Sequence, residues 1–230
     1  MLNLIAAASF FLLIHLAVSG TRVRDALVGR LGANAYMGLF SLVSVAGLVW
    51  LGFAFAGARE AIDGAPIWSM SAVTHGLQFL LQMVAVLFVV VGLATPNPTS
   101  VRQETVLDRP QSVQGVLRIT RHPFLWGVAL WALGHLLVNG DPASLILFGS
   151  MLALALFGTA SIDAKRRRAL GGKWDQFAAQ TSNIPFLAVA QGRQRLDLGE
   201  IGAWRILAAV VVWIGLTLAH PFLFGVGVLY

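Results

Sequence analysis

Cysteine is absent from the 230-residue chain, and its absence excludes several kinds of site. Without thiols there can be no disulfide, no cysteine-based zinc site, no iron–sulfur cluster and no thiolate ligand to haem. A bound metal would have to use histidine, carboxylate or the atoms of a cofactor. Cysteine usage is a common indicator of redox compartment, and it gives no information for this sequence.

Charged residues are scarce: Asp, Glu, Lys and Arg make up 11% of the chain, whereas 57% of the residues are hydrophobic. Soluble domains carry about 25% charged residues. The apolar residues form runs of about 20, the length with which a helix crosses a bilayer core. Six such runs lie at residues 2–19, 35–58, 73–95, 119–138, 142–161 and 204–224. We therefore expect an all-α membrane protein, a polytopic bundle of about six transmembrane helices that forms one domain over residues 1–230.

The basic residues are distributed unevenly between the two sides of these runs. All of the 16 lysines and arginines except Arg59 follow the first, third or fifth run. The positive-inside rule makes those segments cytoplasmic, so both termini are expected on the non-cytoplasmic side of a bacterial inner membrane. The same loops account for the net charge of +6, and we expect no nucleic-acid partner. The first run has no basic segment before it, so we do not expect a cleaved signal peptide.

Two polar segments carry further structural predictions. The sequence "NGDP" at 139–142 predicts a tight turn, and hence an antiparallel hairpin of the fourth and fifth runs. The segment "DAKRRRALGGKWDQFAAQ" mixes bases with Leu170, Trp174 and Phe177. This mixture predicts an amphipathic helix at the inner membrane surface. The alternative is a simple anchor to anionic lipids, without chemistry.

The five histidines, His15, His75, His122, His135 and His220, all lie in or at the edge of apolar runs. Ionisable groups are costly there and usually face the bundle interior, so they mark a candidate site; packing residues are the alternative. The predicted topology places His75, His135 and His220 in an outer layer, and His15 and His122 in an inner one. Thirteen residues of continuous helix would separate His122 from His135 by about 20 Å, too far to ligate one iron.

His122 precedes Pro123, a favourable residue for the first turn of a helix. Together with Arg118 and Arg121, it is expected to face anions or lipid headgroups. Asp163, the main carboxylate near the bilayer, is expected to pair with a neighbouring base. The sequence has no P-loop, HExxH or GxSxG motif that would indicate another chemistry.

Five ordered motifs carry a family resemblance: "LRITRHPFLWGVALWALGHLLVNGD", "LFG", "DAKRRRALGGKWDQFAAQTSNIPF", "GRQRL" and "AHPFLFG". Together they resemble the NnrU family, particularly its 15-cis-zeta-carotene isomerase branch, over about residues 115–225. The resemblance implies a membrane protein that binds haem b through histidines and isomerises a cis double bond of an apolar polyene. The family's namesake is linked instead to nitrite and nitric oxide metabolism. Whether the chain is an enzyme therefore stays open, with the isomerase favoured over a non-enzymatic sensor or assembly factor.

The resemblance implies His135 and His15 as the metal ligands. Helical rise would set these two about 15 Å apart along the membrane normal, so His75, nearer in depth to His135, is a rival for the second axial place. His220 is a candidate for a further ligand or a neighbour of the cofactor.

Cofactor binding is also conceivable at the start of the fourth run. Arg118, Arg121 and His122 would meet haem propionates if the macrocycle lay near the inner face, and lipid phosphates otherwise. "RHPFLWG" followed by "IPF" is also similar to isoprenylcysteine carboxyl methyltransferases. That resemblance implies an S-adenosylmethionine-dependent membrane methyltransferase, although Asp163 and "KRRR" stand where that family carries two glutamates.

Overall fold

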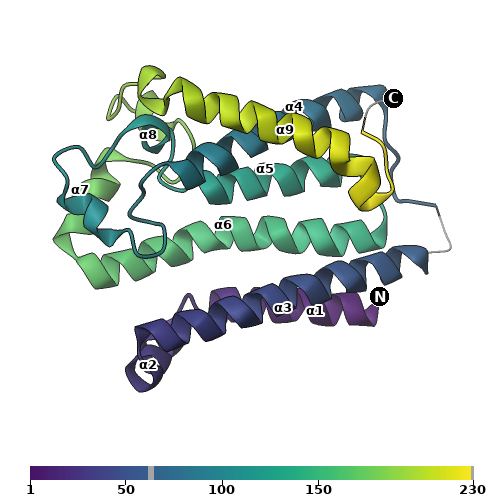
Figure 1. The fold of residues 1–230 in the computed structure, drawn as a ribbon, viewed down its shortest axis with the longest axis horizontal. Coiled ribbons are helices and arrows are strands. Elements are labelled where there is room, and N and C mark those ends of the chain that lie inside the picture. The colour runs from purple at the N-terminus through teal and green to yellow at the C-terminus, as the bar shows by residue number, and fades with distance from the viewer. Residues whose placement is uncertain (62–64, 229–230) are drawn as a thin grey trace. The chain divides into compact units, whose positions relative to one another are not determined.

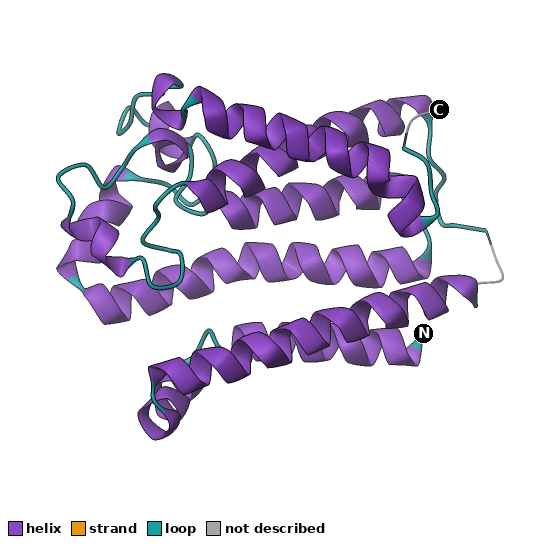
Figure 2. Ribbon diagram, in the orientation of Figure 1, coloured by secondary structure: helices purple, strands orange, loops and turns teal. Residues whose placement is uncertain are grey.

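The computed structural model describes residues 1–61 and 65–228, and these residues form helices and loops without a strand (Figure 2). The expected all-α class is thereby confirmed. The helices of more than four residues labelled in Figure 1 are α1 (Leu2–Leu13), α2 (Arg22–Leu31), α3 (Ala33–Glu60), α4 (Ala72–Ala94), α5 (Pro123–Val138), α6 (Pro142–Leu170), α7 (Gly172–Gln180) and α9 (Ala203–Phe224). The shorter elements are η1 (Ile14–Val18), η2 (Glu104–Asp108), η3 (Gly115–Arg118), α8 (Leu187–Ala190) and η4 (Gly199–Ile201).

Four of the described helices, α3, α4, α6 and α9, are long and apolar enough to cross a membrane. A fifth span is possible if α1, η1 and α2 count as one span bent by 79°. Helix α5 is apolar but has only 16 residues. The chain is therefore an all-helical protein with several candidate membrane spans, while the number six and the direction of the termini stay predictions.

The described chain clusters into two compact units. Unit 1 comprises Met1–Gln78 and Ala132–Lys165, and unit 2 comprises Phe79–Trp131 and the chain from Arg166 onward. The boundaries fall inside α4, α5 and α6, so these helices contribute residues to both units. Each unit has its own packing and is described separately below.

In unit 1, α1 runs antiparallel to α3. Trp50 near the middle of α3 donates from Nε1 to Oδ1 of Asn3, 3.0 Å away. A Cβ at Gly47 would lie 3.1 Å from the Phe10 ring, so the missing side chain lets the two helices approach closely. The Phe55 ring of α3 contacts the Phe148 ring of α6 at 6.1 Å between centroids. Aromatic side chains thus hold this unit together.

The turn between α5 and α6 has the predicted form. The Asp141 carboxylate accepts hydrogen bonds from the backbone N–H and the hydroxyl of Ser144, at 2.9 and 2.6 Å, and caps α6. Pro142 occupies the first helical position, where its fixed φ is favourable. A Cβ at Gly140 would lie 2.3 Å from the carbonyl oxygen of Trp68, so only glycine fits. The tight turn expected from "NGDP" is confirmed.

In unit 2, α4 runs antiparallel to both α5 and α9. Gln82 of α4 donates to the carbonyl of Trp131 in α5 over 3.1 Å. On the other side, the Phe79 and Trp213 rings lie 4.8 Å apart, and Arg205 near the start of α9 donates to the carbonyl of Ala94 at the end of α4. These pairs fix the register of the three helices.

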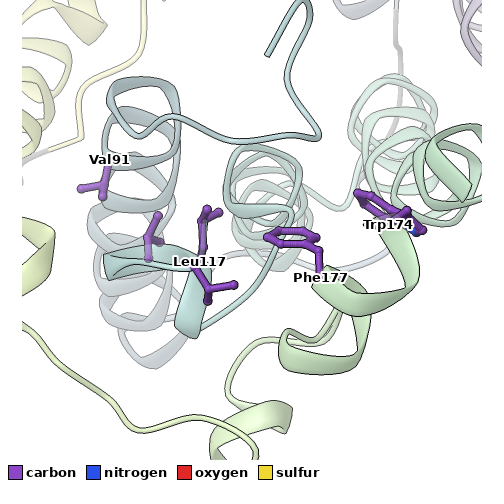
Figure 3. Packing of buried hydrophobic residues seen from close by; sticks show 6 residues of the cluster. Val91, Leu117, Trp174 and Phe177 are labelled. Carbon is purple, nitrogen blue, oxygen red and sulfur yellow. The ribbon is translucent and has the colours of Figure 1, made fainter. Parts of the chain in front are cut away.

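The core of unit 2 brings together Val91, Val113, Val116, Leu117, Trp174 and Phe177 (Figure 3). Trp174 and Phe177 are 0% and 2% exposed. Both residues lie on α7, so the expected amphipathic helix is present, but its apolar face contacts protein and not lipid. Gly171, at a φ of +53°, separates α6 from α7, and the apolar face of α7 packs on protein.

Candidate functional site

The start of α5 is held by a chain segment some sixty residues later. The N–H of Arg121 donates to the carbonyl of Ser182 over 2.9 Å, and the N–H of Phe186 donates to the carbonyl of Ile119 over 2.8 Å. These bonds place "RITRHPF" against "TSNIPF". They also explain why α5 begins at Pro123 and not at residue 119 as expected: the preceding backbone pairs with another segment instead of continuing a helix.

Arg118 belongs to an ion pair within unit 2. Its Nε and Nη2 donate to the two carboxylate oxygens of Glu200, at 2.7 and 2.8 Å, and its Nη1 donates to Gln194. Glu200 also accepts the N–H of Gly115. The hydrogen bond from Arg118 is the main cause that lowers the pKa of Glu200 to about 2. The guanidinium expected to face headgroups or propionates therefore ties η3 to η4.

His122 and Arg121 lie in the hydrogen-bonded segment directly before α5. His122 is 2% exposed, so the expectation that it faces lipid headgroups is wrong. Its N–H donates to the hydroxyl of Thr120, which is itself fully buried. The carbonyl of Arg121 accepts hydrogen bonds from the side chains of Asn97 and Thr99. The three residues predicted around the start of the fourth run thus share a polar region, in which Arg118 and the backbone of Arg121 and His122 are hydrogen-bonded.

His15 lies in the π-helical turn η1, a kind of turn that often marks functional sites. Its Nδ1 donates to the carbonyl of Phe11 over 2.9 Å. Since a carbonyl can only accept, the hydrogen is on Nδ1 and the lone pair on Nε2, the nitrogen that a metal would take. The imidazole contacts the rings of Phe11 and Phe40, at 4.4 and 5.3 Å between centroids.

Tyr36 is a neighbour of this histidine that the sequence analysis missed. Its ring stacks on Phe40 at 5.8 Å, and the residue is 6% exposed. Among the described residues, its buried hydroxyl has no hydrogen-bond partner. The spacing of four residues between Tyr36 and Phe40, on one face of a helix, was the available signal.

His135 lies in the last turn of α5 and is half-buried. Its ring stacks on Phe148 of α6, at 4.6 Å between centroids and an interplanar angle of 18°. Its carbonyl accepts from both the N–H and the side-chain amide of Asn139. Phe148 belongs to the motif "LFG", but the sequence alone did not indicate that it contacts a histidine.

The contacts along α3 place His15 and His135 at opposite ends of unit 1. His15 contacts Phe40, whereas His135 contacts Phe148, which contacts Phe55. Positions 40 and 55 of one helix are separated by about 22 Å along its axis. Two axial imidazoles of one haem each approach the iron within a few ångströms. The pair implied by the family resemblance therefore does not meet at one iron in this structure.

The contacts of helix α6 independently show the same separation of His15 from His135. A Cβ on Gly20, five residues after His15, would lie 2.2 Å from Oγ of Ser161. Phe148, which contacts His135, lies thirteen residues earlier on α6, or about 20 Å along the axis.

His75 lies at the same end of unit 1 as His135. The segment before α4 packs on the end of α5: the Trp68 indole donates to the carbonyl of Leu136 over 3.1 Å, and the N–H of Ile67 donates to the carbonyl of Gly140 over 3.0 Å. His75 follows in the first turn of α4. Its position at this end of unit 1 thus favours His75 over His15 as a partner of His135.

His220 lies in the last turns of α9, in unit 2. Its Nδ1 donates to the carbonyl of Val226 over 2.7 Å, and its ring contacts Phe224. Among the described residues, no group of three or more His, Asp or Glu is arranged to hold a metal ion. A haem iron needs only one or two protein ligands, so such a group is not required for haem.

Fold and site together define an all-helical membrane protein whose apolar helices carry half-buried histidines. The chain belongs to the NnrU family, whose family model, described as NnrU protein, matches residues 3–228. It is 26% identical over 223 residues to 15-cis-zeta-carotene isomerase, chloroplastic, of Arabidopsis thaliana, and 25% identical over 219 residues to the protein of the same description from Zea mays.

These matches cover 94% and 92% of this chain, but 58% and 57% of the two plant proteins, so the chain spans less than two thirds of their length. No solved structure matches the chain. The resemblance to the NnrU family and its carotene isomerase branch is confirmed.

Proposed function

We propose that the chain is a membrane-embedded cis–trans isomerase of a carotene-like polyene, with haem b as its cofactor and His135 as a ligand. The observation that carries the proposal is the similarity to two plant 15-cis-zeta-carotene isomerases, which extends over more than nine tenths of the chain. We also propose that the protein lies in a bacterial inner membrane, with the segments that carry all of its basic residues except Arg59 on the cytoplasmic side.

The residues at one end of unit 1 suit a haem. His135 offers an imidazole held against the Phe148 ring, and His75 lies at the same end. His15 lies about 20 Å away along α3 or α6 and would serve another purpose. The bound haem would supply an iron that can polarise a polyene double bond.

The other groups of α5 fit a reaction without proton transfer. Between Pro123 and Val138 the helix carries no carboxylate, and His135 is its only ionisable residue. Phe148 fixes the plane of the imidazole, and Asn139 holds the backbone of the same turn. The surrounding apolar side chains would exclude water and accept a hydrocarbon substrate, which could enter from the lipid.

A visible spectrum of the detergent-purified protein, supplemented with haem, tests the cofactor. We expect a haem spectrum that His135→Ala changes strongly, that His75→Ala also changes, and that His15→Ala leaves as in the wild type. A protein that stays colourless would overturn the cofactor. A response to His15→Ala as large as that to His135→Ala would overturn the proposed ligand pair.

The reaction is tested separately with 15-cis-zeta-carotene in vesicles, the isomers being separated by chromatography. We expect the wild type to convert the 15-cis form and His135→Ala to lose the conversion. Haem binding without conversion would instead favour a non-enzymatic haem sensor, the alternative expected from the family's namesake.

A further inference from the structure

We propose that a hollow at the polar end of unit 2 binds the phosphate headgroup of an anionic phospholipid. The hollow has a volume of about 430 Å³ and lies among the end of α4, the connection from η2 to η3 and the start of α9. Its charged lining residues are Arg109, Arg205 and Glu200, and two amide, two hydroxyl and three apolar residues complete the wall. None of the five histidines lines the hollow, and its binding of a lipid does not depend on the proposed isomerase.

Arg205 is held in a fixed position at the wall of the hollow. Its Nε donates to the carbonyl of Ala94 over 3.2 Å, and its Nη1 donates to the carbonyl of Ile201 over 2.8 Å. Its guanidinium also lies 4.8 Å from the centroid of the Trp204 ring. These bonds are to neutral carbonyls, so the positive charge is not compensated. A planar guanidinium fixed in this way is well suited to phosphate oxygens.

The single carboxylate of the wall does not cancel this charge. Both oxygens of Glu200 accept hydrogen bonds from Arg118, so these two charges compensate each other. Arg109 is exposed, and in the part of the chain that the structure describes it forms no ion pair. The hollow therefore presents the uncompensated charges of Arg109 and Arg205, which favour an anion.

The place of the hollow identifies the anion as a lipid. Helices α4 and α9 are both apolar enough to span a membrane, and the bond from Arg205 to Ala94 joins the end of one to the start of the other. The ends of spanning helices lie at headgroup depth. Trp204 is 60% exposed beside the hollow, as is typical of tryptophans at the membrane interface.

An apolar stripe continues from the hollow along α9. Trp204, Leu207, Val211 and Leu218 are all exposed and follow the i, i+3, i+7, i+14 pattern of one helix face. The stripe extends about 21 Å along the axis, more than half the thickness of a bilayer core. A phospholipid can thus place its phosphate in the hollow and an acyl chain on the stripe, which free phosphate cannot do.

Lipid immobilisation tests the proposal on the full chain. The protein is reconstituted in phosphatidylcholine vesicles with traces of spin-labelled phosphatidylglycerol or spin-labelled phosphatidylcholine, and electron paramagnetic resonance measures the immobilised fraction of each probe. We expect the wild type to prefer phosphatidylglycerol. Arg109→Gln should lower this preference about fivefold, which is the factor for one basic residue at an anionic surface.

Arg205 is left unchanged, because it has backbone partners and its replacement would disturb the fold. Two other variants serve as controls. Arg109→Lys keeps the charge and should retain most of the preference. Arg168→Gln removes an exposed charge of α6 that does not line the hollow, and should leave the preference unchanged. Equal losses in Arg109→Gln and Arg168→Gln, or no preference in the wild type, would overturn the proposal. Release of the phosphatidylglycerol probe by millimolar inorganic phosphate would also overturn it, since the acyl chain would then contribute nothing.

Discussion

The polar end of unit 2 and the histidine-bearing core of unit 1 are stabilised in different ways. The first is held by charged and backbone partners, such as the Arg118–Glu200 pair and the buried Arg166, which donates to Glu104 and to the carbonyl of Ser100. The second is held by ring contacts of His15 and His135 with phenylalanines. Three of the five family motifs contribute to the polar end, so much of the family signature describes architecture and not the proposed haem site.

The difference has a physical basis in the backbone of the two regions. Within the helices of unit 1 the backbone satisfies its own hydrogen bonds, and the rings of His15 and His135 pack on phenylalanine rings. Residues 119–122, between η3 and α5, are not helical, and their buried N–H and carbonyl groups require partners from elsewhere. Ser182 and Phe186 supply them, which explains why a distant polar segment accompanies the start of α5.

Removing the centre of the unit 2 core should have the largest effect on stability. Trp174 is 0% exposed, and Trp174→Ala should lower the free energy of unfolding by about 3–5 kcal/mol. Denaturant titration in detergent micelles, followed by tryptophan fluorescence, measures the change. Trp204→Ala is the control, because this residue is 60% exposed and its loss should change stability by about 0.5 kcal/mol or less. Equal losses of unfolding free energy in the two variants would show that α7 does not stabilise the core.

The comparison also shows which parts of the fold were predictable. The apolar runs located the long helices, and "NGDP" located the turn, since both signals are local in sequence. The late start of α5 depends on partners at Ser182 and Phe186, which no local pattern indicates. Likewise, an alternation of bases and aromatic residues cannot distinguish a lipid surface from the protein surface that buries Trp174.

The candidate site was predictable in its histidines but not in their neighbours. Apolar surroundings identified His15 and His135, because an ionisable group there is costly. The π-helical turn at His15 is a property of backbone hydrogen bonds and has no sequence signal of its own. Phe40 and the Phe148 of "LFG" contact the two imidazoles only through the fold, and no local pattern predicts these contacts.

A glycine pair in unit 1 tests how closely the segment before α4 packs at the His135 end. A Cβ at Gly140 would lie 2.3 Å from the Trp68 carbonyl, a backbone atom that cannot move alone. Gly140→Ala should therefore cost about 1–3 kcal/mol of unfolding free energy in the same titration. Gly149→Ala, in the interior of α6 with nothing within 4 Å, should stabilise by up to about 1 kcal/mol. A neutral Gly140→Ala would contradict the docking of Trp68.

The cap of α6 should make a smaller contribution. Asp141→Ala removes the acceptor of the Ser144 N–H and hydroxyl, and loss of such a cap costs about 1 kcal/mol. Asp141→Asn retains an acceptor for the N–H and should recover much of the loss, as measured by the unfolding midpoint. If the unfolding midpoint fell equally in both variants, the carboxylate charge and not the cap would be the source of the stability.

The Arg118–Glu200 pair should have the smallest effect, because pairs near the surface contribute at most about 1 kcal/mol. Arg118 lowers the pKa of Glu200 from the ordinary 4.5 to about 2. A lowered folded-state pKa gives stability that is complete above pH 4.5 and is lost as the pH falls towards about 2. Glu200→Gln lacks this titration, so its unfolding midpoint should lie below that of the wild type at neutral pH and approach it in this acid range. A difference that stays constant down to pH about 2 would show that the pair does not contribute through the ionised carboxylate.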